Sequence, residues 1–549
     1  MFASFLLSEC LEKIFLNLLD KNSSGDAYTY TSTKDLHSCT LVSRHWCRTS
    51  TPFLYAYPFH HFRHFAYPNI YFHNETYLSY FKLIRTLISC IPKSDIEQII
   101  LSNSSSKLSN LFDFNEETIN LTTFNYVKFI RGLIFDKILS NTYKLFRYQK
   151  IWFPPYISNN NITENQFSKI SIPIINHFLK FLCKNCNNLT TLDFPFTIQN
   201  NEFFNSIIEL LTFNDFNGKN KLRDLKELYY INNYVGRNEE VRSPPNDLYL
   251  ALSNYSCRLN LLYNEQINSI EKANSLSRFI SLQKMLQHII LSENKRDSVV
   301  YAINRLFGDD NIDNNYNIVF NSLSTQSETL KILEFKYIPF NKINEKALNS
   351  LCLLKNIRVL KLYKCREIYD NLNSWAKNLT RLEVFEFVAY YIPTISEGFL
   401  VQLIQSSSKT LTKLVLHYKR EHNQVFQQIP FYSHLLIHLE LPKIFPDELI
   451  LIFKSCTKLI YFSTILSDHG SWENIFRNLG KFIPKNLRKI QFKEMDYLVF
   501  SSNELKCFFQ ECINSNSKLK YLEIIGKCDD VNQEYFKVAR EFGMELIKE

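Results

Sequence analysis

Glycine is scarce in this chain, with only 10 among 549 residues. Phosphate-binding loops need glycines at fixed spacing because the backbone must approach the phosphates closely, and neither Gly-x-Gly-x-x-Gly nor a Walker loop occurs. The Gly-x-Ser-x-Gly and His-Glu-x-x-His signatures of hydrolases and zinc proteases are also missing. The sequence shows no catalytic constellation, so we expect a protein that is not an enzyme and needs no cofactor.

Long apolar runs are also lacking. No stretch of 18 apolar residues occurs, which predicts that the chain does not cross a membrane. The first residues have no basic region, so we do not expect a signal peptide. The 13 cysteines are scattered without a framework and indicate reduced thiols, which favours a cytoplasmic or nuclear protein, or one found in both. A net charge of +9 permits an acidic partner without requiring nucleic acid.

One cysteine pair has the spacing of half a zinc site. Cys183 and Cys186 are not followed by a second Cys-x-x-Cys or by paired histidines at ligand spacing. Cys186 stands three residues before Leu189, just as Cys456 stands three residues before Leu459. We therefore interpret this cysteine as a small buried position of a repeat and predict no metal site.

Two further groups of side chains invite a functional interpretation. The first is a histidine cluster: His60, His61, His64 and His73. These histidines lie among aromatic residues, without carboxylates to orient them as metal ligands, so we interpret them as partly buried. The second group could follow a nucleic-acid backbone: Lys144, Arg147 and Lys150, interleaved with aromatics. A solvated face of an amphipathic helix is the commoner meaning of such a pattern.

The first 55 residues carry two short apolar stripes at helical spacing. Leu36, Cys39, Val42 and Trp46 share one helical face. The earlier stripe consists of Leu11, Ile14, Phe15, Leu18 and Leu19. Short helices of this length cannot bury all of this apolar surface among themselves. The excess must contact the rest of the chain or another protein.

These two stripes resemble the F-box, the helical module that docks on the Skp-type adaptor of cullin ubiquitin ligases. The resemblance lies in Leu7-Ser-Glu-Cys-Leu11 with Ile14-Phe15, and in Leu41-Val42-Ser43-Arg44-x-Trp46. Leu7 stands where the motif usually has proline, and a polar insertion at 21–34 separates the halves. The resemblance implies contacts with the adaptor, and through it the cullin, from six residues: Leu11, Ile14, Leu36, Leu41, Val42 and Trp46.

The F-box-like module occupies residues 1–55, and the rest of the chain divides into two parts. Residues 56–170 are rich in Phe and Tyr and show no repeat, which we interpret as a helical connector with helices near 77–91 and 126–151. From residue 171 to 549 one pattern recurs: leucine, two residues, an apolar residue, one residue, another apolar residue. An irregular stretch near 232–281 is interpreted as an insertion, with a possible degenerate repeat at 259–262.

The recurring pattern is that of leucine-rich repeats. Clear copies begin at Leu330, Ile357, Leu382 and Leu411, at spacings of 23 to 32 residues along the C-terminal half. A strand and a helix in each repeat bury one continuous core only when neighbouring repeats stack. The sequence thus predicts an α/β fold: an N-terminal helical module and connector, then a solenoid with parallel strands on its concave side and helices on its convex side.

The residue between the last two apolar positions of each copy should face the concave side. Eight copies supply Glu334, Lys361, Glu386, Val415, Glu440, Ser463, Gln491 and Glu523. Four are acidic and one is basic, whereas a phosphate-tracking surface would be mainly Lys and Arg. This composition favours a protein partner over nucleic acid. We place that partner on residues just after the strand motifs: Lys336, Tyr337, Tyr363, Lys364, His417 and Tyr418.

Taken with the resemblance, these patterns favour a substrate-recognition subunit of a Skp/cullin/F-box ubiquitin ligase. The F-box would dock the adaptor, and the repeats would hold the protein to be ubiquitylated, whose identity the sequence does not give. A leucine-rich-repeat protein-binding scaffold without a ligase is the first alternative, and a nucleic-acid-binding solenoid is the second.

Overall fold

The structure is a computed structural model that describes most of the chain. The described residues are 7–18, 33–60, 62, 74–103, 124–135, 138–139, 141–153, 163–186, 188–196, 201–212, 221–232, 247–254, 258–267, 269–293, 312–389, 395–418, 424–467, 472–494, 500–527 and 531–548. They form two compact units, Met1–Glu265 and Gln266–Glu549.

The first unit is mainly helical at its start. Its helices are α1 (Ser8–Leu18), α2 (Thr33–Thr40), α3 (Arg44–Leu54), α4 (Asn74–Ile88), α5 (Lys93–Asn103), α7 (Thr142–Arg147), α8 (Gln149–Trp152), α9 (Glu164–Asn185), α10 (Asn201–Thr212) and α11 (Asp247–Ser253), with the 3-10 turn η4 (Tyr126–Phe129). Four strands follow one another in the same sheet, each parallel to the next: β1 (Gly132–Ile134), β2 (Thr191–Phe196), β3 (Glu227–Asn232) and β4 (Leu261–Glu265).

This unit corrects two expectations about the middle of the chain. A continuous helix over 126–151 is wrong, because Gly132–Ile134 forms β1 and pairs with Thr191–Asp193 of β2. The stretch near 232–281 is also not simply an insertion, since it contains α11 and β4 of this unit and, at the start of the second unit, the helix α12 (Ile270–Ser281). Leu259 and Leu262 occupy buried repeat positions there, so this segment contributes a repeat of its own.

The second unit alternates strands and helices to its end. Its strands are β5 (His288–Ser292), β6 (Ile332–Lys336), β7 (Val359–Tyr363), β8 (Val384–Val388), β9 (Lys413–His417), β10 (His438–Ile444), β11 (Tyr461–Leu466), β12 (Lys489–Phe492), β13 (Tyr521–Ile524) and β14 (Glu545–Lys548). Its helices after α12 are α14 (Ile312–Leu323), α15 (Glu345–Cys352), α16 (Asn373–Asn378), α17 (Glu397–Ser406), α18 (Gln424–Tyr432), α19 (Pro446–Ser455), α20 (Trp472–Leu479), α21 (Ser502–Asn514) and α22 (Gln533–Glu541), with the 3-10 turns η5 (Ser324–Gln326), η6 (Asp370–Leu372) and η7 (Gly480–Phe482).

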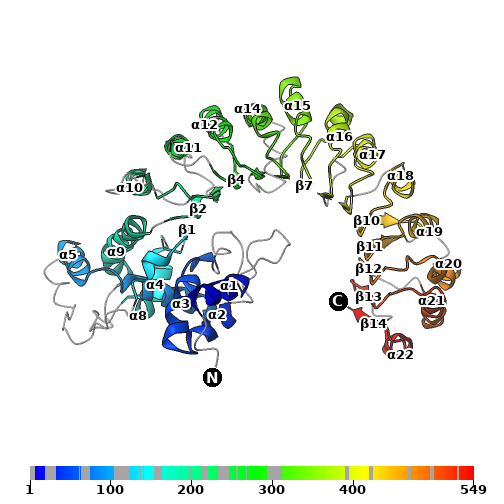
Figure 1. Ribbon diagram of the computed structural model, residues 1–549, viewed down its shortest axis with the longest axis horizontal. Coiled ribbons are helices and arrows are strands. Elements are labelled where there is room, and N and C mark those ends of the chain that lie inside the picture. The colour runs from blue at the N-terminus through cyan, green and yellow to red at the C-terminus, as the bar shows by residue number, and fades with distance from the viewer. Residues whose placement is uncertain are drawn as a thin grey trace. The chain divides into compact units, whose positions relative to one another are not determined.

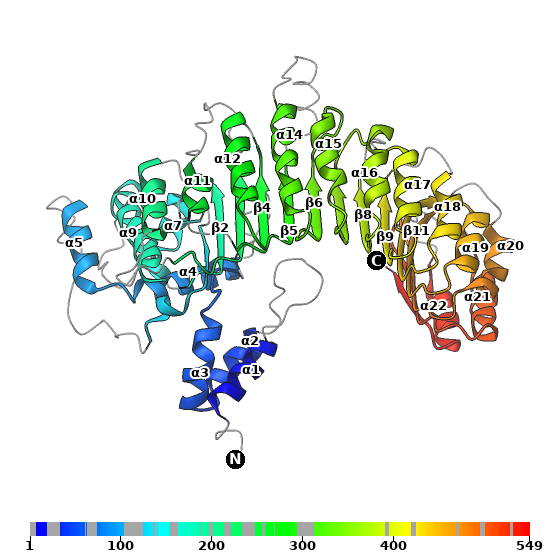
Figure 2. The ribbon, with the colours of Figure 1, turned by 45° about the horizontal axis from the view of Figure 1, so that its top comes forward.

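Each strand of the second unit pairs in parallel with the next one along the chain. Within this unit the strands line the inner side of an arc and helices α14–α22 cover its outer side (Figure 1), while Figure 2 shows the helices standing side by side in chain order. This is the leucine-rich-repeat arrangement that the sequence predicts. The chain therefore has an α/β fold with a leucine-rich-repeat solenoid.

The core of the solenoid consists of the apolar positions of the repeat. Leu360, Leu362, Leu414, Leu416 and Leu522 are all buried, which confirms their expected places. Side chains alternate between the two faces of a strand, so these residues face the helices while the residues between them face the opposite side. The alternation makes the inner face of the sheet a polar surface of predictable register.

Candidate protein-binding surfaces

The three N-terminal helices form a small module with its own core. Leu11, Phe15 and Leu36 make up this core, and Trp46 and Phe53 pack against it. The Phe15 ring lies edge-on to Trp46, with 5.7 Å between ring centroids. Ser43 caps α3 by accepting a hydrogen bond from the backbone N–H of Trp46, which fixes where this helix begins.

The structure divides the six expected adaptor contacts into two groups. Leu41 and Val42, in the turn between α2 and α3, are 74% and 54% exposed, and Ile14 is also exposed. Leu11 and Leu36 differ from the expectation of a contact surface, because both are completely buried in the module core. Trp46 is half-buried against the same core. Direct contact with another protein is thus open to Ile14, Leu41 and Val42.

Further apolar side chains of this module are exposed to solvent. Leu7 precedes α1 and Leu16 lies within it, and both are exposed. Leu7 and Ile14 are seven residues apart and so lie on one side of α1. The core of the module is filled without these side chains, which leaves their apolar surface available for a partner.

In the second unit, the inner face of the sheet carries three rows of side chains set by the strand register. The middle row runs through consecutive strands as Ile290, Glu334, Lys361, Glu386, Val415, Glu440, Ser463, Gln491, Glu523 and Ile547. The eight residues expected to face inward occupy this one row. Neighbouring strands are about 4.8 Å apart, so each side chain can reach the next.

The first part of this row is a chain of alternating charges. Glu334 contacts His288 at 3.2 Å, from the strand before it, and Lys361 Nζ at 3.3 Å, from the strand after it. Lys361 lies in turn 4.0 Å from Glu386, which accepts a hydrogen bond from Lys413 at 2.7 Å. The carboxylates and cations compensate one another along four strands. This segment of the row therefore presents little net charge.

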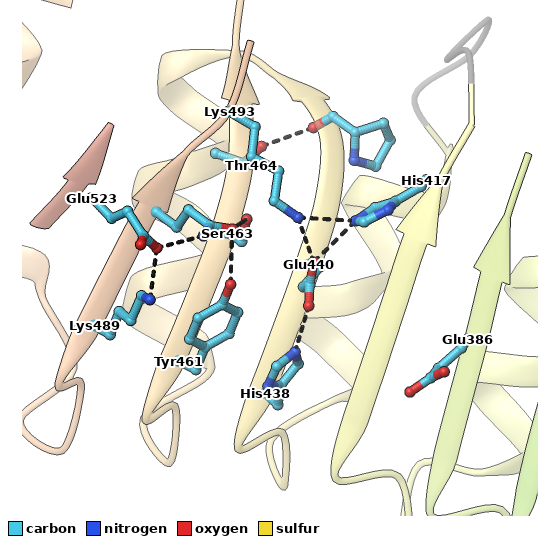
Figure 3. Close-up of polar contacts among 12 residues, drawn as sticks. Glu386, His417, His438, Glu440, Tyr461, Ser463, Thr464, Lys489, Lys493 and Glu523 are labelled. Carbon is cyan, nitrogen blue, oxygen red and sulfur yellow. Dashed lines mark hydrogen bonds and ion pairs between the residues drawn. The ribbon is translucent and has the colours of Figure 1, made fainter. Parts of the chain in front are cut away.

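The second part of the row is centred on Glu440 (Figure 3). His417 lies 3.0 Å away on the preceding strand, and His438 lies 2.8 Å away on the same strand. Lys493, which follows β12, donates a hydrogen bond at 2.6 Å to the same carboxylate. Three potential cations thus surround one acid.

The partners of these glutamates lower the pKa values of their carboxyl groups. Burial acts to raise the pKa of Glu334, but the hydrogen bond from His288 and the charge of Lys361 outweigh it and hold the pKa at about 2. For Glu440 burial again opposes the charged form. The hydrogen bonds from His417, His438 and Lys493 prevail and hold its pKa well below the usual range. Both carboxylates are therefore charged at neutral pH.

The last part of the row is a hydrogen-bonded group on β11–β13. Gln491 accepts hydrogen bonds from the Tyr461 and Ser463 hydroxyls at 2.9 Å and donates one to Glu523. Lys489 adds an ion pair to Glu523 at 2.6 Å. The polar groups of this part satisfy one another. The centre of the inner face is therefore polar, and few of its polar groups remain available to bind a charged ligand.

The structure brings three of the six expected partner contacts into direct association. Tyr337 and Tyr363 meet edge to face with 5.7 Å between ring centroids, and Lys364 Nζ lies 5.7 Å and 5.4 Å from these two rings. Tyr337 and Lys364 have left-handed backbone conformations, with φ of 62° and 52°. Lys336 ends β6 directly before Tyr337. This tyrosine–lysine group lies where β6 and β7 end.

The other two expected contacts lie apart from this group. His417 is in register with Tyr363 two strands away, through Val388, and contacts Glu440 and Lys493. Tyr418 differs from the expectation of an exposed contact, because it is 8% exposed and its ring packs edge-on against Phe387. A partner that binds the tyrosine–lysine group would have little of Tyr418 to contact.

The remaining groups singled out in the sequence are placed as follows. Cys183 and Cys186 are buried, and burial raises the pKa of the Cys183 thiol to about 12, which disfavours the thiolate that a metal binds. His60 is buried, while His61, His64 and His73 lie outside the described residues. Lys144 lies over the ring of Tyr77, 4.2 Å from its centroid.

Two features are absent from the described residues. No group of three histidine, cysteine, aspartate or glutamate side chains in the described ranges is arranged to hold a metal ion. None of the described helices combines the length and the apolar character needed to span a bilayer.

Neither the protein-family models nor the curated proteins yield a match to this chain. Among solved structures it is similar to the leucine-rich-repeat protein LegL7 from Legionella pneumophila, at 12% identity and a TM-score of 0.31 over 63% of this chain and 95% of that one. An internalin (inlF) from Listeria monocytogenes is similar at 14% identity and a TM-score of 0.30, over 67% and 81% of the two chains.

The crystal structure of the Rad7 and Elc1 complex in yeast provides a third similar chain. The identity is 14% and the TM-score 0.34, over 71% of this chain and 98% of that one.

Proposed function

We propose that this protein is a substrate-recognition subunit of a Skp/cullin/F-box ubiquitin ligase. In this proposal helices α1–α3 dock on the adaptor, and the leucine-rich repeats bind the protein to be ubiquitylated. Catalysis would belong to other subunits, so this chain would contribute proximity and orientation.

The observation that carries the proposal is the apolar surface of the N-terminal module. Leu41, Val42 and Ile14 are exposed although the module has a packed core of its own. Exposed apolar side chains gathered on so small a module are typical of a protein interface. Their places in the sequence coincide with the part of the chain that resembles the F-box, which supports an adaptor as the occupant.

The repeats support the second half of the proposal through the tyrosine–lysine group. Tyr337 and Tyr363 are partly exposed, and tyrosine offers large contact area with little side-chain entropy to lose. The neighbouring row of compensated charges is rigid and largely neutral. A protein surface with apolar and hydrogen-bonding groups would suit this region better than a phosphate backbone would.

The adaptor experiment uses the full-length chain co-expressed with a Skp-type adaptor and purified through a tag. Leu41→Asp with Val42→Asp should reduce recovery of the adaptor by tenfold or more, because both charges would be buried in the interface. The matched control is Leu250→Asp with Leu451→Asp, two exposed leucines of other helices, which should keep adaptor recovery at the wild-type level.

The possible outcomes distinguish a ubiquitin-ligase subunit from a protein-binding scaffold that is not attached to a ligase. If the wild-type chain recovers no adaptor, attachment to a ligase is wrong and a protein-binding scaffold remains. If the Leu41 and Val42 variant still recovers the adaptor, the docking surface lies elsewhere. Thermal unfolding of both variants should match the wild type, which checks that neither result comes from misfolding.

A second experiment addresses the repeats alone. Tyr337→Ala, Tyr363→Ala and Lys364→Ala together should leave adaptor recovery unchanged but remove the protein captured by the repeats. Retention of every captured protein by this triple variant would place substrate binding outside the tyrosine–lysine group.

A further inference from the structure

A row of basic side chains runs along the edge of the second unit where the strands begin. Seven consecutive loops lead into β7–β13, and six of them, all except the one before β10, carry a lysine or arginine one or two residues before the first apolar residue of the motif. These side chains are Lys355, Arg381, Lys409, Lys458, Lys485 and Lys518, and they are defined here as the basic edge. The loop before β10 carries His434 at the same place.

Backbone and side-chain contacts place these loops next to one another. The backbone N–H of Lys518 donates to the carbonyl of Lys485 at 3.0 Å. The Arg381 guanidinium donates to the side-chain oxygen of Asn356, directly after Lys355, at 2.6 Å. His434 contacts the carbonyl of Ser455, three residues before Lys458, at 3.4 Å. The basic edge is therefore one surface.

The six cations of the basic edge are exposed and uncompensated. All six side chains are exposed, and across the described ranges none of them forms an ion pair with a carboxylate. This is the opposite of the inner face, where each lysine of the charged row meets a glutamate. Cations without partners raise the local potential and attract an acidic ligand.

The helix dipole does not explain this row. Cations stabilise a helix C-terminus mainly within its last turn. The last turns of α15, α17, α18 and α21 contain no basic residue, and Lys355, Lys409 and Lys518 lie in the loops three or four residues beyond their helices. A structural role in capping would place the charges inside the helices instead.

Apolar side chains interrupt the basic edge near its middle. Ile437 and Ile460 directly precede the adjacent strands β10 and β11, and both are exposed. They are joined by a 2.8 Å hydrogen bond from the Ile460 N–H to the Ile437 carbonyl. The corresponding positions before the other strands from β6 to β13 hold Lys331, Arg358, Glu383, Thr412, Arg488 and Lys520. Phe431, near the end of α18, and Leu353, after α15, add further exposed apolar surface on these loops.

We propose that the basic edge binds an extended acidic polypeptide segment in which aspartate or glutamate is interspersed with apolar residues. On one side of an extended peptide, successive side chains are about 6.6–6.8 Å apart. This distance lies between the separation of neighbouring strands, about 4.8 Å, and the separation of packed helices, about 8–10 Å. The loops of the basic edge connect the helices to the strands, so the distance between their cations should lie between these two separations. Successive cations can therefore meet successive acidic side chains of the peptide. The isoleucine pair would receive an apolar side chain.

A nucleic acid fits this surface less well. Its backbone would use the cations, but among the four exposed apolar side chains named here only Phe431 has an aromatic ring that can stack on a base, whereas Ile437, Ile460 and Leu353 do not. The inference goes beyond the proposed function and does not rest on it. The basic edge shares no residue with α1–α3. Adaptor binding can therefore fail while peptide binding by the basic edge holds, and peptide binding can fail while adaptor binding holds.

The test is fluorescence anisotropy with the full-length chain and three labelled probes. The first is a peptide of about 12 residues, which spans about 40 Å when extended, with glutamate and leucine interspersed. The second is a peptide of the same length and charge with serine in place of leucine. The third is single-stranded RNA of equal charge. Three variants are compared with the wild type, and thermal unfolding confirms that each one folds.

The charge-reversal variant is Lys458→Glu with Lys485→Glu and Lys518→Glu. Its matched control is Lys346→Glu with Lys506→Glu and Lys537→Glu, which changes the net charge equally at exposed positions of α15, α21 and α22. We expect the first variant to bind the glutamate–leucine peptide at least about tenfold more weakly, because local charges act within the short screening length. The control should change the affinity by less than about threefold, since its charges are more distant.

The apolar variant is Ile437→Ser with Ile460→Ser. It should weaken the glutamate–leucine peptide severalfold and leave the serine peptide unchanged. The proposal is overturned if the wild type binds none of the peptides, or if the two charge variants lose affinity equally. Tighter binding of RNA than of either peptide, insensitive to the isoleucine changes, would make the basic edge a nucleic-acid surface instead.

Discussion

Lys493 Nζ lies 2.6 Å from Glu440 Oε2, although 53 positions separate the two residues in the sequence. Glu440 belongs to β10 and Lys493 follows β12, so the contact passes over β11. It ties three strands together on the inner face at a place where β10 is irregular between Glu440 and Lys443.

Replacing Lys493 with Met should lower the free energy of unfolding by about 1–3 kcal/mol, the usual cost of losing a hydrogen bond to a charged group. Urea unfolding monitored by circular dichroism would measure it. Lys485→Met, which removes an exposed lysine without an acidic partner in the described structure, should change stability by less than about 0.5 kcal/mol. Equal effects of the two substitutions would contradict a stabilising role for the Lys493–Glu440 contact.

Acid should weaken the second unit through Glu334. Because its folded pKa of about 2 lies below the ordinary value of 4.5, its contribution is fully present above the ordinary value. The contribution declines as the pH falls from about 5 toward 2, and at about 1.4 kcal/mol per pKa unit it is on the order of 3 kcal/mol.

The check for Glu334 compares urea unfolding of the wild type and Glu334→Gln over this pH range. The difference in unfolding free energy should be largest near pH 6 and shrink as the pH approaches 2. A difference that stayed constant with pH would show that His288 and Lys361 do not favour the charged carboxylate.

Leu414 tests the packing of the repeats. It is completely buried, so Leu414→Ala should cost about 2–5 kcal/mol, as for other well-packed core leucines. Leu353 is exposed, and Leu353→Ala should cost less than about 0.5 kcal/mol. Thermal and urea unfolding of both variants would distinguish them, and a small loss for Leu414 would mean that the core can collapse around the cavity.

Gly480 allows α20 and α21 to approach closely. A Cβ added there would lie 2.5 Å from the Phe508 carbonyl oxygen and 2.8 Å from the Cys512 backbone nitrogen, and neither backbone atom can rotate away. Gly480→Ala should therefore destabilise the protein by about 1–3 kcal/mol through overpacking.

Gly398→Ala is a useful comparison in differential scanning calorimetry. The atom nearest to its added Cβ is a side-chain oxygen of Asp370, which can move. A milder effect at Gly398 than at Gly480 is expected. The opposite order would contradict the backbone contact as the reason for glycine at 480.

The repeat pattern was sufficient to predict strands to within one residue. The copies that begin at Ile357 and Leu411 predict strands near 358–362 and 412–416, because apolar and polar residues alternate there. The structure has these strands at Val359–Tyr363 and Lys413–His417. Residues 126–151 were harder to predict. Gly132–Ile134 has no polar alternation, and only its pairing with β2 makes it a strand.

The candidate surfaces were less predictable than the fold. The sequence identified the inward row, but Glu440 pairs with Lys493, which lies outside that row and follows a strand two places along the sheet. Leu36 and Leu41 look equally suited to an interface in the sequence, and only packing separates the buried one from the exposed one. The basic edge could have been seen in the sequence from the lysine or arginine that precedes six of the seven repeat motifs from Ile357 to Leu519.

The alternating order of Glu334, Lys361 and Glu386 limits how this solenoid can change in length. Excision of the single repeat that carries β7 would bring β6 beside β8, with Glu334 directly opposite Glu386. Two carboxylates facing each other on neighbouring strands repel, so the shortened array would lose an attraction and gain a repulsion at once. In this part of the molecule the repeats are consequently not interchangeable. Loss of two adjacent repeats should be tolerated better than loss of one wherever the two strands that become neighbours carry middle-row charges of opposite sign.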